Sequence, residues 1–448
     1  MGGTDATTSL LWSALGGPPG LEEGVSYRGS GAVLPARLPV RQLARAAVGV
    51  CSLAAAELLA ARCGGAVRPV EVDEGAVATA FVSERHLRVD GRPMVPFAPL
   101  SGFWRTADGW VRTHANYPHH RRRLLAALDL ARDAGAEDLG RALAALPARR
   151  VQESVYAAGG LAVAVADRPD PARPPVVERR PAPGTADRVP GPADLPAAGV
   201  RVLDLTRVIA GPVATRTLAL LGADVLRVDP PGLPEDRDTH VDTAPGKRSA
   251  LLDLGAPGDR AVFEDLLAAA DVVVTGYRPG ALDRYGLSPR DLAERRPGLV
   301  TASLCAWDRS GAFSGRRGFD SLVQAGTGIA AAEAGEDGAP GALPAQALDH
   351  GTGYLLAAAV LRALTDRAAD GRGRDLRLSL AGTAGLLLHG IAPAPAPGGV
   401  HDPERWLTAA DSPYGGLRYA RPPIGYAGAP RDWASSPTRQ GSDAPAWR

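Results

Sequence analysis

The segment RVLDLTRVIAGPVATRTLALLGADVLRVD, residues 201–229, predicts the central unit of the fold. It contains an apolar strand at 202–205, a short helix that starts near Pro212, and a second strand at 224–228. Proline suits the first turn of a helix, where its missing N–H is not needed. The free amides at such a helix start can bind an anionic ligand. Because the segment lacks the G-x-G-x-x-G spacing of a dinucleotide-binding turn, we expect a nucleotide-like ligand other than NAD.

Strands and helices alternate after this unit. We expect strands at 249–254, 271–275 and 299–304, and helices at 259–269 and 289–295. This alternation predicts an α/β fold with a parallel sheet covered on both faces. The loops that follow the strands should meet at the carboxyl edge of the sheet, where such sheets bind ligands. The expected loops are 206–211, 276–280 and 305–308.

Proline- and glycine-rich stretches divide the 448 residues into parts. We expect a large α/β domain and, ahead of it, a smaller α+β domain that includes a hairpin with an Asp108-Gly109 turn. The other segments are interpreted as a leader, a linker and a C-terminal tail that either wraps over a core or is disordered. The boundaries are 1–35 for the leader, 36–166 for the smaller domain, 167–197 for the linker, 198–390 for the large domain and 391–448 for the tail.

Composition argues against several classes of protein. The formal net charge is +1, so no global field favours nucleic acid or a membrane surface. Cys51, Cys63 and Cys305 are too few and too scattered for a disulfide framework or a zinc site. The sequence shows no basic region followed by an apolar core, as in a signal peptide, and no apolar run that suggests a membrane span. These features predict a cytoplasmic protein without a metal site, a nucleic-acid partner or a membrane partner.

Lys247 is the only lysine in a chain that otherwise uses arginine for its basic side chains. A genomic bias toward arginine explains why lysine is rare, but it does not explain the lysine that remains. A compact ammonium differs from a planar guanidinium where a single oxygen must be reached. We therefore interpret Lys247 as a functional residue.

Asp349 is the candidate for chemistry. The segment ALDHGTG at 347–353 leads into an apolar helix at 354–364, which places Asp349 just ahead of a helix N-terminus. Free amides and the helix dipole favour an ionised carboxylate there, and such a carboxylate can attack an activated acyl group. An ordinary capping aspartate is the other interpretation, and spacing alone favours it. His350 receives no role, because adjacent side chains usually diverge.

Several short motifs occur in order across roughly residues 198–390. They are LDLTRVIAGP at 203–212, LGADV at 221–225, GKRS at 246–249, RPG at 278–280, LDRYG at 282–286, GFD at 318–320 and GRGRD at 371–375. Through them the chain resembles the family III CoA-transferases, also called the CaiB/BaiF family. The combination is more specific than any one motif. The resemblance implies that 198–390 is a Rossmann-like domain that binds CoA and carries the catalytic residue.

The resemblance also implies a mechanism. Asp349 matches the family nucleophile, which attacks a thioester to give an aspartyl–acyl anhydride and then carries CoA as an aspartyl-CoA thioester. The implied partners are an acyl-CoA and a carboxylic acid, with coenzyme A as a substrate, no tightly bound cofactor, and a homodimer as the assembly. The residues that match CoA-binding positions or border them are Arg207, Val208, Ala210, Lys247, Gly276, Tyr277, Arg278 and Arg284.

The chain departs from the family pattern in its cleft loops and in its order. Thr275-Gly276-Tyr277 stands where Glu-Asn-Phe is usual, and Ala306-Trp307-Asp308 stands where Gly-Phe-Gly or Gly-Tyr is usual. The bulky Trp307 predicts a narrower acyl pocket. A family hairpin that normally follows the catalytic aspartate occurs here at 103–109, before the large domain. Residues 70–76 also echo residues 376–382. A rearranged or partly duplicated family member would have this order.

Three functions remain compatible with the sequence. The first is a CoA-transferase that acts through Asp349. The second is an acyl-CoA racemase or epimerase of the same family, although the family's racemase histidine falls near 318–320, where this chain has Phe319. The third is a catalytically inactive CoA-binding paralogue, suggested by the altered loops at Gly276 and Trp307. Retention of Asp349 favours an active enzyme.

Overall fold

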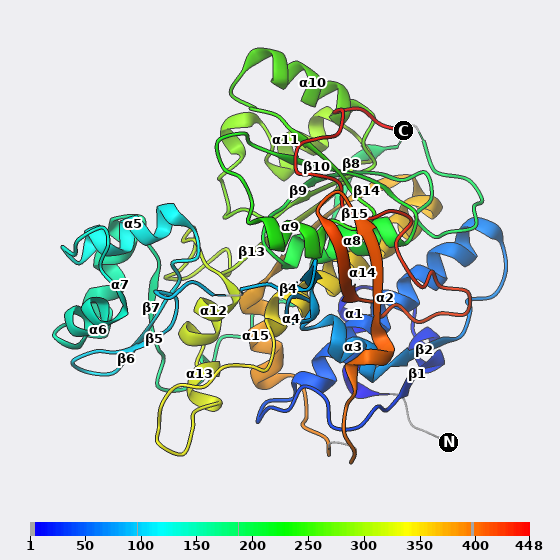
Figure 1. The fold of residues 1–448 in the computed structure, drawn as a ribbon. Coiled ribbons are helices and arrows are strands. Elements are labelled where there is room, and N and C mark those ends of the chain that lie inside the picture. The colour runs from blue at the N-terminus through cyan, green and yellow to red at the C-terminus, as the bar shows by residue number, and fades with distance from the viewer. Residues whose placement is uncertain (1–4, 96, 187, 396–397) are drawn as a thin grey trace.

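A seven-stranded sheet forms the centre of the computed structural model, which describes residues 5–95, 97–186, 188–395 and 398–448 (Figure 1). The strands lie in the order β11-β10-β9-β12-β13-β14-β8, and all neighbours are parallel except β14 and β8. Their bounds are Arg248–Leu251 for β11, Asp224–Asp229 for β10, Arg201–Leu205 for β9, Val272–Thr275 for β12, Val300–Cys305 for β13, Arg372–Ser379 for β14 and Glu178–Thr185 for β8. The predicted α/β class with a parallel sheet is confirmed.

The strand order defines where a ligand can enter. Counted from β9, the parallel strands run 3-2-1-4-5-6, which is the order of a doubly wound sheet. The order reverses between β9 and β12, and ligands bind such sheets in the crevice outside the carboxyl ends at that point. The expected strands at 202–205 and 224–228 lie within β9 and β10, whereas β11 ends at Leu251 and is shorter than expected.

Both faces of the sheet are buried, because successive side chains point to opposite sides of a strand. In β12, Val272 and Val274 join one apolar core while Val273 joins the other. The first core is shared with helices α8 (Ala210–Leu220), α14 (Ala347–Asp370) and α15 (Leu380–His389), and the second with α10 (Pro257–Ala268) and α11 (Pro289–Arg295). This two-sided burial explains why the strand sequences are apolar without alternation.

Helix α2 (Val40–Cys63) packs along α14 within the first core (Figure 1). By length and composition it could cross a membrane, so the expectation that no apolar run suggests a membrane span was wrong. In the protein, 89% of its most apolar window is buried, so packing against α14 accounts for its composition. The expected division into domains stays a prediction, and we note that α2, assigned there to the smaller domain, contacts the core of the large sheet.

The expected leader contains a helix, α1 (Ala6–Ala14), that packs on α2. Leu11, Trp12 and Leu15 are buried in the first core. Packing thus orders this part of the chain, although its sequence is too short to give a clear periodic signal. Residues 1–4 of the leader lie outside the described residues.

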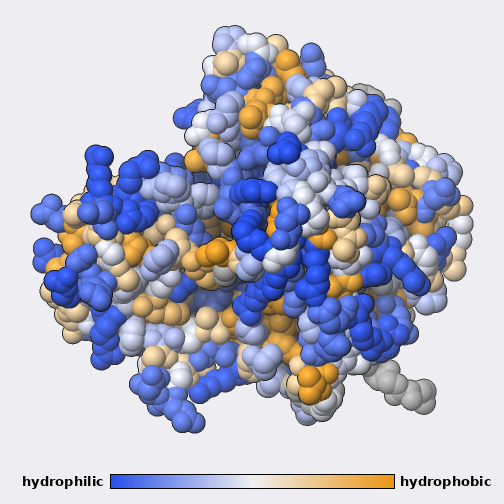
Figure 2. Space-filling model, viewed as in Figure 1, coloured by the Kyte–Doolittle hydropathy of each residue, from blue (hydrophilic) through white to orange (hydrophobic). Residues whose placement is uncertain are grey.

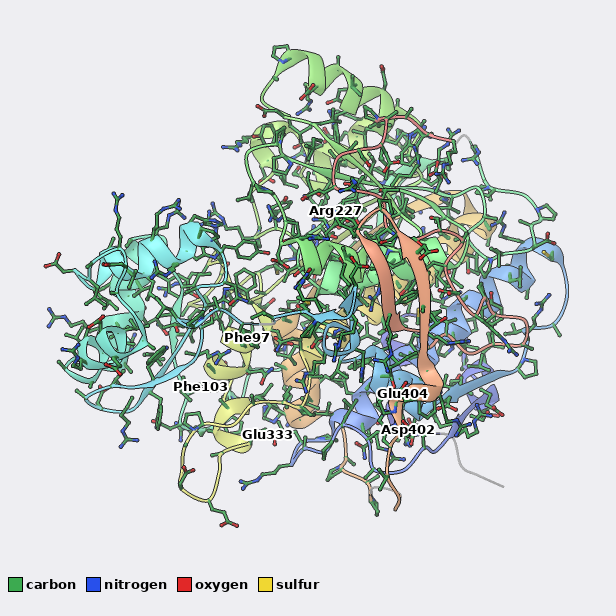
Figure 3. The ribbon with its side chains drawn as sticks, in the orientation of Figure 1. Phe97, Phe103, Arg227, Glu333, Asp402 and Glu404 are labelled. Atoms are coloured by element: carbon green, nitrogen blue, oxygen red, sulfur yellow. The ribbon has the colours of Figure 1, made fainter. Side chains whose placement is uncertain are left out.

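A small α+β body lies to one side of the large sheet, at the left of Figure 1. Its three-stranded sheet, in the order β5-β6-β7, and its helices share an apolar core of their own. The guanidinium of Arg112 lies over the rings of Phe97 and Phe103, both labelled in Figure 3. The elements are β5 (Phe103–Arg105), β6 (Trp110–Thr113), β7 (Ala162–Ala164), α5 (Pro118–Ala127), α6 (Ala136–Ala144) and α7 (Ala148–Ala157). Strands β5 and β6 form the predicted hairpin.

Two segments expected to be irregular join the large body. Strand β8 lies inside the expected linker and pairs with β14. In the tail, Trp433 and Trp447 donate their ring N–H groups to the backbone oxygens of Arg216 and Leu266, so the tail wraps over the large body. A four-stranded sheet links the tail to the N-terminal region through β15 (Leu407–Ser412), β16 (Gly415–Ala420), β3 (Arg88–Val89) and β4 (Arg92–Pro93). Residues 187, 396 and 397 lie outside the described residues.

The remaining elements connect these layers. Strands β1 and β2 form a two-stranded parallel sheet beside α2. The bounds are η1 (Leu21–Gly24), β1 (Val25–Arg28), β2 (Val70–Asp73), α3 (Glu74–Ala80), α4 (Ser83–His86), α9 (Arg237–Thr243), η2 (Asp283–Tyr285), α12 (Asp320–Gly326), α13 (Ile329–Ala332) and η3 (Pro403–Trp406).

We predict that α2 and α14 are held together partly by a buried ion pair. Arg362 of α14 and Glu57 of α2 lie 2.6 Å apart, with the side chains 4% and 9% exposed. Arg362→Leu should lower the free energy of unfolding by about 3 kcal/mol, because it leaves the Glu57 carboxylate buried without its partner. The double variant Arg362→Leu/Glu57→Leu should recover most of that loss. Chemical denaturation followed by circular dichroism measures both, and equal losses in the single and double variants would contradict the prediction.

Candidate active site

A cavity of about 510 Å³ lies at the carboxyl edge of the sheet. It is lined by residues at or after the ends of β9, β10, β11, β12 and β13, by the first turn of α14, and by the small body at 117–120. Hydrophilic residues gather on the surface between the small body and the upper part of the large body (Figure 2). The cavity therefore lies where a doubly wound sheet binds its ligand.

Most of the site residues predicted from sequence line this cavity. Their backbone positions follow from the sheet, since the turn after β9 and the loop after β12 flank the point where the strand order reverses. The predicted residues in the lining are Arg207, Val208, Ala210, Gly276, Tyr277, Arg278, Arg284 and Asp349. Their roles stay predictions.

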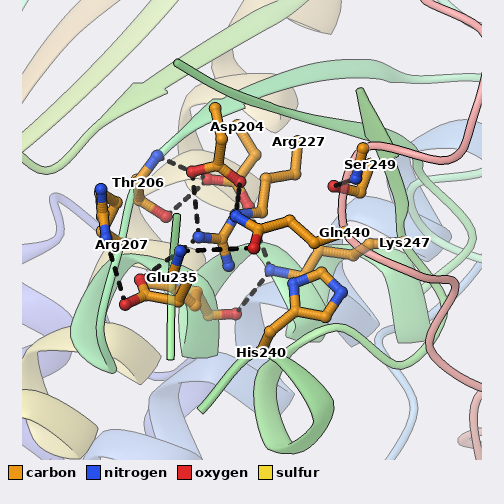
Figure 4. A network of polar contacts seen from close by, with 12 residues as sticks. Asp204, Thr206, Arg207, Arg227, Glu235, His240, Lys247, Ser249 and Gln440 are labelled. Atoms are coloured by element: carbon orange, nitrogen blue, oxygen red, sulfur yellow. Dashed lines mark hydrogen bonds and ion pairs between the residues drawn. The ribbon is translucent and has the colours of Figure 1, made fainter. Parts of the chain in front are cut away.

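Lys247 is the exception, because it is buried and does not line the cavity in which it was predicted to contact CoA. Its ammonium is buried behind the turn after β9 and donates to Asp204 Oδ2 at 3.0 Å, to Thr215 Oγ1 at 2.8 Å and to the Pro212 carbonyl oxygen at 3.3 Å (Figure 4). These acceptors match the three donors of an ammonium. Burial lowers the pKa of Lys247 to about 8, against the opposing effect of Asp204. Lys247 therefore holds the backbone of the turn after β9 and does not line the cavity.

The turn after β9 is strained and is held by a buried carboxylate. Val208 has a φ of +69°, a conformation that β-branched residues rarely adopt. Its amide donates to Glu235 Oε2 at 2.9 Å. Glu235 also accepts the Tyr117 hydroxyl at 2.6 Å and pairs with Arg207 at 3.3 Å. One carboxylate thus ties the turn to the small body.

Arg227 completes this network from within β10 (Figures 3 and 4). Its side chain is buried, with Nε 2.7 Å from Asp229 Oδ2 and a terminal nitrogen 3.3 Å from Glu235 Oε2. Burial alone would raise the pKa of Glu235, but Arg207 and Arg227 lower it overall. Glu235 was not predicted from the sequence, because it lies in a proline-rich loop that shows no periodic pattern.

Asp349 is the third residue of α14, which begins at Ala347. The prediction that the helix starts near Tyr354 was therefore wrong. The amides of Leu348 and Asp349 donate to Asp320 Oδ2 at 2.9 and 3.0 Å. Asp320, rather than Asp349, caps the helix, and Asp349 forms part of the cavity lining instead.

The electrostatic expectation for Asp349 is also reversed. Its pKa lies well above the ordinary value, mainly because of burial and further because of the nearby Asp320 and Glu84 carboxyl groups. Burial raises the pKa of Asp320 to about 6, although its amide hydrogen bonds oppose this. The helix start does not favour ionised Asp349, since its amides serve Asp320. Ionisation of Asp349 therefore needs a compensating charge or a ligand.

The small body supplies an aromatic wall beside Phe319. The His114 ring stacks on Phe319 with centroids 3.7 Å apart, and His120 meets the same ring edge-on at 5.9 Å. Burial lowers the pKa of each histidine to about 3, so both rings are neutral near pH 7. Phe319 and His120, both uncharged, line the cavity.

Trp307 does not line the cavity, so the expected narrowing of the pocket was wrong. The ring is buried, stacks on Phe313 at 4.3 Å and donates its N–H to the backbone oxygen of Arg317 at 3.3 Å. A Cβ on Gly318 would come within 2.6 Å of the indole nitrogen. Glycine is thus required at 318, and Trp307 supports this loop from behind.

Two arginines of the lining have no ion-pair or side-chain hydrogen-bond partner within the described ranges. These are Arg278, after β12, and Arg317, before α12. Burial lowers the pKa of Arg317, and the charges of Arg278 and Arg123 lower it further. Cations that repel one another in this way favour an anionic ligand.

Part of the chain is similar to known proteins. Residues 197–408 match the family model of CoA-transferase family III. A probable fatty acyl-CoA transferase of Mycobacterium tuberculosis is 36% identical over 189 residues, covering 39% of this chain and 48% of that protein. The acetyl-CoA:oxalate CoA-transferase of Acetobacter aceti is 33% identical over 214 residues, covering 45% and 54%. The succinyl-CoA:glutarate CoA-transferase of Homo sapiens is 31% identical over 229 residues, covering 48% and 52%.

Solved structures give partial matches as well. The crystal structure of a hypothetical protein from Mycobacterium tuberculosis is 32% identical, with a TM-score of 0.42, and covers 46% of this chain and 58% of that one. A CAIB/BAIF family protein from Brucella suis is 26% identical, with a TM-score of 0.39, over 50% and 65%. The chain spans about half the length of the curated relatives described above. Residues 197–408, which include Asp349, are similar to CoA-transferase family III.

Proposed function

We propose that this protein is a CoA-transferase that moves coenzyme A between carboxylic acids. The observation that carries the proposal is the position of Asp349, in the lining of the cavity at the carboxyl edge of a family III sheet domain. A buried carboxylate in a cavity that admits a thioester can act as a nucleophile. The cavity also presents two unpaired arginines to an anionic ligand such as the phosphates of CoA.

The proposed reaction proceeds through covalent intermediates on Asp349. Its carboxylate attacks the thioester carbonyl and expels CoA thiolate, which leaves an aspartyl–acyl anhydride. The thiolate then attacks the aspartyl carbonyl of the anhydride, giving an aspartyl-CoA thioester and the first free acid. The acceptor carboxylate attacks this thioester and again releases thiolate. Attack of the thiolate on the acyl carbonyl of the new anhydride gives the product acyl-CoA and restores Asp349.

The proposed CoA site uses the loops on either side of the strand-order reversal. The backbone at Val208 and Ala210 would border the pantetheine and adenosine portions, and the loop from Gly276 to Arg278 would form a second wall. Arg278 and Arg284 supply positive charge at that wall. The names of the relatives include oxalate and glutarate as acceptors, and we propose a carboxylic acid without selecting one. A homodimer and a cytoplasmic location stay predictions.

A racemase of the same family is the second candidate. His120 lines the same cavity as Asp349, and such an enzyme needs two groups on opposite faces of an α-carbon. Phe319, however, occupies the place where the resemblance puts the racemase histidine. Exchange of the α-proton of an acyl-CoA in D₂O, without exchange of CoA between acids, would favour this candidate.

We predict that Asp349→Asn lowers CoA exchange between acids about a thousand-fold or more, because the amide cannot act as the nucleophile. Incubation of the wild-type protein with acyl-CoA and hydroxylamine should trap a hydroxamate on Asp349, detectable by peptide mass spectrometry. Asp370→Asn, at the other end of α14, serves as the matched control and should keep both properties. Equal turnover in Asp349→Asn would refute the covalent mechanism, and an absence of any exchange or trapping in wild type would favour a CoA-binding protein without turnover.

We also predict that Asp349→Asn makes the protein more stable at pH 8. The raised pKa means that the folded state holds this proton more tightly than the unfolded state does. The contribution of Asp349 to stability therefore falls as pH rises above the unfolded value of about 3.9. Asparagine does not titrate, so the gain should be larger at pH 8 than at pH 5. Thermal unfolding at the two pH values measures it, and a variant less stable than wild type at pH 8 would contradict the assigned direction.

A further inference from the structure

The N-terminal region repeats the architecture around Asp349. Helices α2 and α14 each have 24 residues and end at a glycine with positive φ, Gly64 and Gly371. Each leads into a strand, β2 or β14, that pairs in parallel with an earlier strand, β1 or β13. Each strand then enters a helix, α3 or α15, capped by the side chain of Asp73 or Ser379. We call residues 25–86, from β1 to α4, the N-terminal repeat.

The N-terminal repeat packs directly on the helix that carries Asp349. Its α2 lies along α14, and α4 follows α3 after a short turn. The ring of Phe81, between α3 and α4, stacks on His350 with centroids 5.4 Å apart and on Tyr354 at 5.8 Å. The repeat therefore covers the first turns of α14 on the side of His350.

A carboxylate from this repeat faces the residue next to Asp349. Glu84 Oε2 lies 3.7 Å from His350 Nε2, and both residues are buried. Within the described part of the chain, this oxygen and both ring nitrogens of His350 have no hydrogen-bond partner. An apolar ring could stack on Phe81 equally well. Packing alone therefore does not explain why a histidine lies opposite Glu84.

Two carboxyl groups oppose the ionisation of Asp349. Asp320 of α12 and Glu84 of α4 both raise its pKa. Asp320 and Glu84 are themselves affected by His350. Burial raises the pKa of Asp320 and would raise that of Glu84, whereas the imidazole of His350 lowers the pKa of both carboxyl groups. On α4, Arg85 lies 3.8 Å from Glu84, but its side chain is 53% exposed, so its charge is screened.

We propose that His350 is a positioning residue, whose ion pair with Glu84 offsets the negative charge that opposes the ionisation of Asp349. In this pair the imidazole offsets the charge of Glu84 and, in part, that of Asp320. The N-terminal repeat thereby contributes to the site without touching substrate. This inference rests on the proposed role of Asp349 as nucleophile.

The titration of the Asp349 carboxyl tests the pair directly, by carbon-13 NMR of protein labelled at aspartate Cγ, with Asp349→Asn to assign the signal. His350→Gln should raise the midpoint by about one pH unit, because it leaves Glu84 charged beside Asp349 without its partner. Glu84→Gln should lower the midpoint, because it removes a negative charge. The double variant should lie between the two single variants.

The ion pair predicts that the midpoint of the Asp349 titration shifts in opposite directions in His350→Gln and Glu84→Gln. Shifts in the same direction, or no shift, would overturn the inference. Glu84→Gln preserves shape and serves alone if His350→Gln fails to fold, since an unchanged or raised midpoint in it contradicts the inference. His401→Gln is the matched control, because His401 contacts Thr79 and Trp406 outside the cavity, and it should not move the midpoint.

The NMR titration needs no turnover, so it separates this inference from the proposed function. If the midpoint shifts in opposite directions in a protein that transfers no CoA, the inference about the Glu84–His350 pair is supported and the proposed transferase function is rejected. If the protein transfers CoA but the midpoint does not shift in this way, the proposed transferase function is supported and the inference about the pair is rejected. In an active protein, the acid limb of the kcat/KM profile should move with the NMR midpoint in each variant, which loss of packing alone would not produce.

Discussion

The position of Asp349 depends on a second carboxylate. Asp320, at the start of α12, accepts the amides of Leu348 and Asp349, groups that a helix start leaves without partners. Since those amides are satisfied, the Asp349 side chain is not needed as a cap and contributes to the cavity wall. The same arrangement buries both carboxyl groups. Burial raises the pKa of each, and Asp320 raises that of Asp349 further. The geometry that places Asp349 in the cavity wall therefore opposes its ionisation, and the surrounding groups must offset that cost.

Buried charge supports the turn after β9 in a similar way. A buried ion pair often adds little stability over an apolar pair of the same size. The pairs here instead hold backbone groups: Glu235 accepts the strained amide of Val208, and Lys247 donates to the carbonyl of Pro212. The acceptors around Lys247 converge on one point, which suits a compact ammonium better than a planar guanidinium. This fit offers a structural reason for the single lysine of an arginine-rich chain, in place of the ligand contact expected from sequence.

The sequence predicted the features that depend on local pattern. The strands and turn of 201–229 were predicted because apolar strands and a Pro212 helix start are local signals, and the positions of the lining residues follow from the sheet. The start of α14 was not predicted because the glycines in its first turns are poor helix formers. A Cβ on Gly353 would come 2.6 Å from the Ala210 oxygen, so glycine there permits close approach of α14 to α8 rather than ending a helix. Glu235 and Glu84 were missed because their partners, Val208 and His350, are distant in sequence.

The segment order expected from the sequence, with the small body ahead of the large sheet, is compatible with a single site because the site depends on adjacency in space. The cavity lies between loops of the large sheet and the Tyr117–His120 segment of the small body, and Glu84 backs it from the N-terminal repeat. Strand β8 returns the chain to the edge of the same sheet after the small body, which fixes the earlier segments against the later ones. Packing of α2 on α14 does the same within the core. Asp349 can thus line the crevice that the strand order defines, although the small body precedes the large sheet in the sequence.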